Sequence, residues 1–120
     1  HRGGLVAQQR VDDAKDALQR TYDAARSLSK HDVVMRHDDA LAALDHLGQA
    51  GLRIESWEGW VRLADGTRTK SLMHQGSFAL PLDASASVST AREMIAQAQR
   101  RWERAPEYAG GELYFKLTVV

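Results

Sequence analysis

The segment His74-Gln75-Gly76-Ser77 holds the residue types that could perform nucleophilic catalysis. An imidazole close to a serine hydroxyl can act as a general base and activate it for attack. The segment lies between two predicted strands, and loops carry functional residues disproportionately. The Gly-x-Ser-x-Gly turn of serine hydrolases is absent, however, and the sequence places no acid beside the pair. A small hydrolase or ligand-binding enzyme that uses His74 and Ser77 with a Glu is therefore an alternative hypothesis, and a non-catalytic protein is favoured.

Aromatic and basic residues gather in the adjacent stretch. Trp60 stands between Glu58 and Arg62, and Arg68 and Lys70 follow across a predicted hairpin. Trp and Arg are enriched in interface hot spots, and charges around an aromatic anchor set specificity. These five residues are the predicted contact site for a protein partner. Aromatic rings beside cations also suit single-stranded nucleic acid, so a nucleic-acid adaptor is a further alternative.

The other titratable residues predict no metal or cofactor. The chain has five histidines and no cysteine. The gaps from His31 to His37 and from His37 to His46 do not give the i,i+4 spacing that places two imidazoles on one metal. A phosphate-binding glycine motif is also absent. We therefore expect no metal, no cofactor and no catalytic residue.

Composition narrows the class of protein. The chain has 120 residues, of which 43% are hydrophobic and 27% charged, and this fits one domain of a globular protein. Lys+Arg and Asp+Glu both number 16, a balance that makes nucleic acid an unlikely partner. No apolar run reaches the roughly 20 residues of a membrane span, and the lack of cysteine fits a cytoplasmic protein. Residues 1–4, His-Arg-Gly-Gly, are interpreted as a tag remnant or a flexible end.

Two helices are predicted in the first part of the chain. Apolar residues recur three and four apart over residues 5–28, and again from about Val33 or Asp38 to Gln49. Gly51 is well placed as a left-handed C-terminal cap, with Leu52 as its hydrophobic contact. Residues 5–50 are thus expected to form a helical hairpin. The narrow, Ala-rich seam of the first helix makes a homodimer through that helix a second hypothesis.

From residue 51 onward the pattern predicts a β-β-β-α-β unit. Strands are expected over residues 52–63, 67–73 and 77–82, with a turn at Asp65-Gly66 and a break at Gln75-Gly76. Residues 83–89 are expected to be a loop, and a capping box formed by Thr90 and Glu93 predicts a helix to about residue 104. The last strand is expected after Gly111. The predicted fold is a single α+β domain with element order α-α-β-β-β-α-β and a mostly antiparallel four-stranded sheet.

The stretch Ser56-Trp57-Glu58-Gly59-Trp60 breaks the alternation of its strand. Leu52 and Ile54 share one face, but the apolar residues after Ser56 fall on the other. A β-bulge near this point, helped by Gly59, would place Leu52, Ile54, Trp57, Val61 and Leu63 together in the core. Trp60 would then point to the opposite face.

These patterns favour one function over the alternatives. We expect a small non-catalytic protein-binding module that acts through the face of the hairpin, such as an inhibitor or a toxin-neutralising, immunity-like protein. Trp60 serves as the aromatic anchor in this hypothesis, and the four charged residues around it select the partner.

Overall fold

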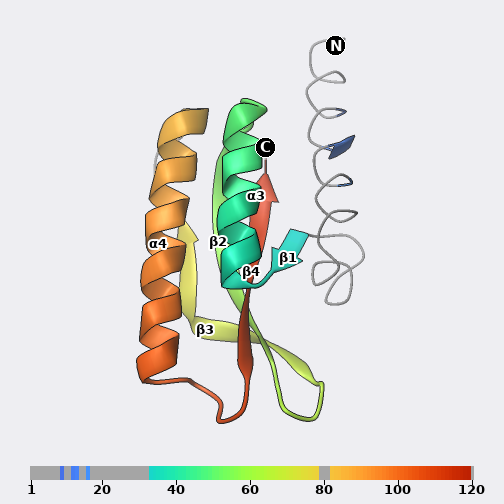
Figure 1. Cartoon of the computed structure of the whole chain (residues 1–120), viewed down its shortest axis with the longest axis vertical. Coiled ribbons are helices and arrows are strands. Elements are labelled where there is room, and N and C mark those ends of the chain that lie inside the picture. Colours follow the sequence, from blue (N-terminus) through green and yellow to red (C-terminus); the bar gives the residue numbers. More distant parts are fainter. Residues whose placement is uncertain (1–8, 10–11, 14–15, 17–32, 79–81, 120) are drawn as a thin grey trace.

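The computed structural model describes residues 33–78 and 82–119, together with Gln9, Asp12, Asp13 and Asp16. The elements of the continuous part are β1 (Val33–Met35), α3 (His37–Gln49), β2 (Ile54–Arg62), β3 (Arg68–Ser77), α4 (Ala84–Arg104) and β4 (Glu112–Val119). The four strands form one antiparallel sheet in the order β1-β4-β2-β3. Helices α3 and α4 lie side by side on one face of this sheet (Figure 1). The prediction of an α+β fold with an antiparallel four-stranded sheet is confirmed.

The predicted helical hairpin over residues 5–50 is not supported. Its first helix lies outside the described residues, apart from four positions that are helical and exposed. The second helix is shorter than its longer predicted version, because Val33 to Met35 form strand β1. Val33 pairs with Leu117, and Met35 pairs with Phe115. β-branched residues such as Val33 and Val34 favour a strand over a helix, and pairing with β4 satisfies their backbone groups.

Helix α3 ends as its sequence predicts. Gly51 adopts a left-handed φ of 73°, which is unfavourable for residues that carry a Cβ. Its N–H donates to the Gly48 carbonyl at 3.1 Å, and the Leu52 N–H donates to the Leu47 carbonyl at 3.0 Å. This pair of bonds is a Schellman motif, which satisfies carbonyls at the helix end. Leu47 and Leu52 are both buried, so the cap also directs the chain into the core.

The predicted break at Gln75-Gly76 and the separate strand over residues 77–82 are wrong. Strand β3 continues through both residues to Ser77, and Leu82 lies outside any strand. Residues 79–81 lie outside the described part. Gly76 is needed for contact within the sheet, since a Cβ there would stand 2.3 Å from Nε1 of Trp57. The glycine that suggested a turn therefore makes room for an indole ring.

Helix α4 begins earlier than predicted. The loop expected over residues 83–89 forms its first turns, and the Thr90–Glu93 capping box is not its start. Asp83 is the N-cap, and its carboxylate accepts a hydrogen bond from the Ala86 N–H at 2.7 Å. Ser87 is fully buried one turn before Ala91, so the buried face continues into the small-residue segment.

The β-bulge predicted near Ser56 is confirmed. Ile54 pairs with Val119 and Ser56 pairs with Thr118, which leaves Glu55 as an extra residue in β2. The extra residue lets Ile54 and Trp57, an odd number of positions apart, share the core face. The other predicted core residues of this strand also face the core; Leu52 and Val61 are buried and Leu63 is half-buried.

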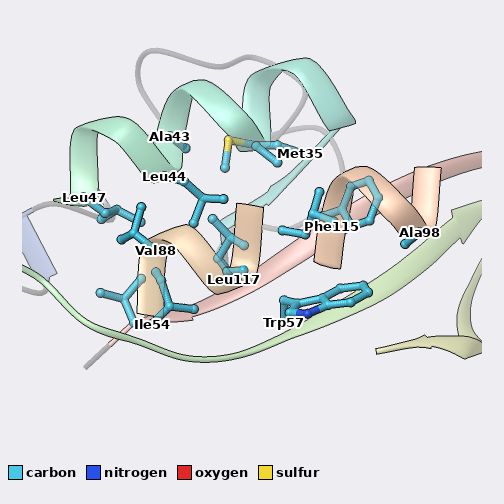
Figure 2. Close-up of a cluster of buried hydrophobic side chains, with 14 of the residues drawn as sticks. Met35, Ala43, Leu44, Leu47, Ile54, Trp57, Val88, Ala98, Phe115 and Leu117 are labelled. Carbon is cyan, nitrogen blue, oxygen red and sulfur yellow. The ribbon is translucent and has the colours of Figure 1, made fainter. Parts of the chain in front are cut away.

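The core lies between the sheet and the two helices. Figure 2 shows Leu44 and Leu47 of α3 and Val88 of α4 directed toward Leu117 and Ile54 of the sheet. The rings of Trp57 and Phe115 lie 5.8 Å apart between their centroids. Burial of these side chains anchors β2 and β4 as the central strands.

Candidate functional site

The five residues predicted to bind a partner lie on the sheet face opposite α3 and α4. Trp60 pairs with Lys70 and Arg62 pairs with Arg68 across the β2–β3 hairpin. Nζ of Lys70 lies 3.5 Å from Oε1 of Glu58, and Nε1 of Trp60 donates to Oε2 of Glu58 at 3.3 Å. The structure thus brings these residues together. Their role in binding stays a prediction.

Trp60 is half-buried. Its ring packs against Val34 and Tyr114, a small apolar cluster separate from the main core. Trp57, by contrast, is 1% exposed within the core. The predicted division of the two tryptophans between the two faces is confirmed, and Trp60 both stabilises its face and presents part of its ring.

His74 and Ser77 do not form a pair. Ser77 is exposed at the end of β3, whereas His74 is 2% exposed and contacts other partners. Nδ1 of His74 lies 2.9 Å from Oγ of Ser71 and 2.8 Å from Oε1 of Glu107. The Ser71 hydroxyl also donates to Glu107 and accepts from the His74 backbone N–H at 3.1 Å. We call Ser71, His74 and Glu107 the buried polar cluster.

A large bulge in β3 creates this cluster. Lys70 pairs with Trp60 and Gln75 pairs with Glu58, so four residues of β3 lie opposite Gly59 alone. A Cβ on Gly59 would stand 2.8 Å from the His74 carbonyl oxygen, so only glycine fits beneath the bulge without displacement. The bulge turns its first and last residues, Ser71 and His74, inward. Leu72 and Met73 between them are 80% and 72% exposed.

The buried polar cluster connects two segments of the chain by hydrogen bonds, and its geometry differs from that of a catalytic triad. A serine nucleophile and the acid that orients its base normally contact different nitrogens of the histidine. Here Ser71 and Glu107 both contact Nδ1 of His74, and the ring packs edge-on against Trp102 with centroids 6.0 Å apart. The cluster therefore ties the bulge of β3 to the connection between α4 and β4.

Electrostatics keep Glu107 ionised in this position. Burial acts to raise the pKa of the Glu107 carboxyl, which would favour the neutral form. Hydrogen bonds from Ser71 and His74, attraction to His74 and the Leu72 backbone N–H outweigh burial and hold that pKa below its ordinary value. The Glu107 carboxylate thus accepts a hydrogen bond from the backbone N–H of the exposed Leu72. This bond helps to hold the bulge of β3 in place.

A second polar site lies beside the turn of the β2–β3 hairpin. A cavity of about 420 Å³ is lined by Arg36, Arg62, Leu63, Ala64, Gly110 and Glu112, and we call it the arginine pocket. The guanidinium of Arg36 donates to Oε2 of Glu112 at 2.9 Å and to the Tyr114 hydroxyl at 3.3 Å. The hydrogen bond to Tyr114 is the main cause that raises the pKa of Arg36, and Glu112 adds to it.

The sequence analysis did not find four residues of these two sites. Glu107 and Ser71 are 36 positions apart, and Arg36 and Glu112 are 76 apart. Only the sheet order β1-β4-β2 brings Arg36 beside Glu112. The bulge that turns Ser71 inward left no local signal apart from a polar residue at each end of Leu72-Met73.

Among the described residues, no group of three or more His, Cys, Asp or Glu side chains could hold a metal ion. None of the helices in the described part is long and apolar enough to cross a membrane.

No protein-family model matches the chain, and no curated protein matches its sequence at a significant level.

Proposed function

We propose that this chain is a non-catalytic protein-binding module that contacts its partner through the β2–β3 hairpin. The observation that carries the proposal is the exposure of Leu72 and Met73, at 80% and 72%. They are the exposed large hydrophobic residues of the described part. Water contact with two adjacent large apolar side chains is unfavourable, and burial against a partner would remove it.

The bulge presents these side chains in a fixed arrangement. Its backbone is held at Leu72 by Glu107 and at His74 by Ser71. A contact surface that is ordered before binding loses less conformational entropy on binding. Lys70 precedes the apolar pair on β3, so a charged group flanks it and can orient a partner.

An inhibitory or toxin-neutralising role is the specific form that we propose for this module. Such proteins act by covering a surface of the partner and need no reactive group of their own. The hydrolase alternative is less favoured because His74 is buried away from Ser77. The nucleic-acid alternative is less favoured because Glu58 and Glu112 interrupt the basic residues of the same face. The homodimer through residues 5–28 and the cytoplasmic location stay predictions.

The proposal is tested by a double variant of the apolar pair. Leu72→Ser with Met73→Ser removes the exposed apolar surface, and Gln97→Ser on the exposed side of α4 is the matched control. Substitutions at such exposed positions change stability by about 0.5 kcal/mol or less, so the fold should persist by circular dichroism. Partners are captured from the native host, identified by mass spectrometry and then titrated in purified form.

We expect the double variant to bind the purified partner at least tenfold more weakly, whereas the control binds like the unmodified chain. Equal affinity of all three proteins would refute the role of the hairpin.

A further inference from the structure

We propose that the arginine pocket binds a carboxylate from an acidic segment of the partner protein. This inference rests on the proposed function and adds the chemistry of the partner. The ligand group is an Asp or Glu side chain, placed so that apolar residues of the same segment reach Leu72 and Met73.

The first observation is an accumulation of positive charge beside the turn of the β2–β3 hairpin. Arg62 ends β2, where it pairs with Arg68 of β3 on one side and with Glu112 of β4 on the other. Arg36, the N-cap residue of α3, lines the same pocket as Arg62. Like charges directly opposite one another destabilise a sheet. In the wall of the arginine pocket, Arg36 and Arg62 share one acidic residue, Glu112.

The second observation is that the Glu112 carboxylate already accepts hydrogen bonds from residues other than Arg62. Its Oε2 accepts from Arg36 at 2.9 Å and from the Tyr114 hydroxyl at 3.2 Å. The side chain of Arg62 makes no hydrogen bond or ion pair with any residue that the structure describes, although Glu112 is its strand neighbour. Its guanidinium can therefore donate to a ligand, and the planar fork of arginine matches the two oxygens of a carboxylate.

The third observation is the shape of the site. The cavity of about 420 Å³ has Arg36 and Arg62 in its wall, with Leu63, Ala64 and Gly110 as small or apolar neighbours. It can receive a single side chain. A nucleic-acid strand would instead need several cations in a row, and Glu58 on the same face of β2 interrupts such a row.

The position of the pocket fits a peptide that also covers the bulge. Arg68, the strand partner of the pocket residue Arg62, lies four residues before Leu72 on β3. This corresponds to at most roughly 13 Å along the strand, since the bulge begins at Ser71. An extended partner segment of about five residues spans that distance. An acidic residue at one end and an apolar residue at the other would meet both features.

The test uses a fluorescein-labelled peptide of ten glutamates, with a Gly-Ser peptide and a ten-nucleotide oligo-dT strand of the same label as comparisons. Binding is measured by fluorescence anisotropy at low salt. Arg62→Gln is the test variant, and Arg100→Gln, exposed on α4, removes the same charge elsewhere. Arg62→Lys keeps the charge and removes the fork.

We expect Arg62→Gln to weaken binding of the glutamate peptide at least tenfold, Arg62→Lys to weaken it less, and Arg100→Gln to change it by less than twofold. Because Arg62 opposes Arg68, the thermal midpoint of Arg62→Gln should stay equal or rise, whereas a purely structural role for Arg62 predicts a fall. Absence of binding, equal losses in Arg62→Gln and Arg100→Gln, or tighter Arg62-dependent binding of the oligo-dT strand would overturn the inference.

Failure here is distinguishable from failure of the proposed function. If Arg62→Gln binds the captured partner like the unmodified chain while the Leu72→Ser, Met73→Ser variant does not, the hairpin role stands and the carboxylate site is wrong.

Discussion

Replacement of Glu107 by alanine tests whether the buried polar cluster holds the bulge of β3. The Glu107 carboxylate accepts from the Ser71 hydroxyl, from His74 at 2.8 Å and from the backbone of Leu72. Hydrogen bonds to a charged group contribute about 1.5–3 kcal/mol. The side chain of Glu107 is 12% exposed, so water can replace part of the loss. We expect Glu107→Ala to lower the free energy of unfolding by about 2–3 kcal/mol at neutral pH.

The pH dependence of this loss has a definite sign. The pKa of Glu107 is lowered in the folded protein, so the folded state keeps the charge at acidities where the unfolded chain, near its ordinary value of 4.5, is protonated. The stabilisation is therefore complete above about pH 4.5 and is lost as the pH falls through the folded pKa. The difference between the two proteins should be largest at pH 7 and should shrink as the pH is lowered toward 3.

Urea denaturation followed by tryptophan fluorescence measures both effects, since Trp102 packs against the His74 ring. A urea dependence of about 1–3 kcal/mol per molar converts the expected loss into a midpoint shift of about 0.7–3 M. Glu93→Ala, which removes an exposed carboxylate from α4, is the matched control and should shift the midpoint little. A loss below about 0.5 kcal/mol for Glu107→Ala, or a difference that grows on acidification, would refute the reasoning.

Two further predictions concern the bulges. Gly59→Ala places a Cβ 2.8 Å from the His74 carbonyl oxygen and should lower the free energy of unfolding by about 1–3 kcal/mol in thermal melts; an unchanged midpoint would show that the bulge yields easily. Ser87→Ala removes the hydroxyl that accepts from the Ile54 N–H at 3.0 Å and leaves a buried donor unpaired, which costs about 1–3 kcal/mol. Amide hydrogen exchange at Ile54 should accelerate, and unaltered exchange would contradict the assigned bond.

Local signals in the sequence predicted a good part of the fold. Gly51 marked the end of α3, Asp65-Gly66 marked the hairpin turn, and strict alternation marked β4. Each of these features depends on the conformational preference of one or two residues or on a short periodic run. The separation of Trp57 from Trp60 was predictable for the same reason, because one misplaced step in the alternation requires a bulge.

The remainder depends on contacts that are distant in sequence. Strand β1 has only three residues, and its pairing with β4 is what makes it a strand. The early start of α4 could have been predicted, since Ser87 and Val88 extend the helical period of Ala91 and Ile95. The capping box at Thr90 indicated a later start and was preferred. Nothing near Ser71 in sequence indicates Glu107, so the cluster could be found only after folding. The binding role of the hairpin residues stays a prediction.

The bulge in β3 also bears on self-association. A regular edge strand offers an unbroken row of backbone N–H and C=O groups on which another chain can extend the sheet, as in domain swapping and amyloid. Strand β3 is one edge of this sheet, and its four-residue excursion interrupts that row at mid-length. The opposite edge, β1, is only three residues long. The bulge that exposes Leu72 and Met73 therefore also hinders the addition of another strand at this edge.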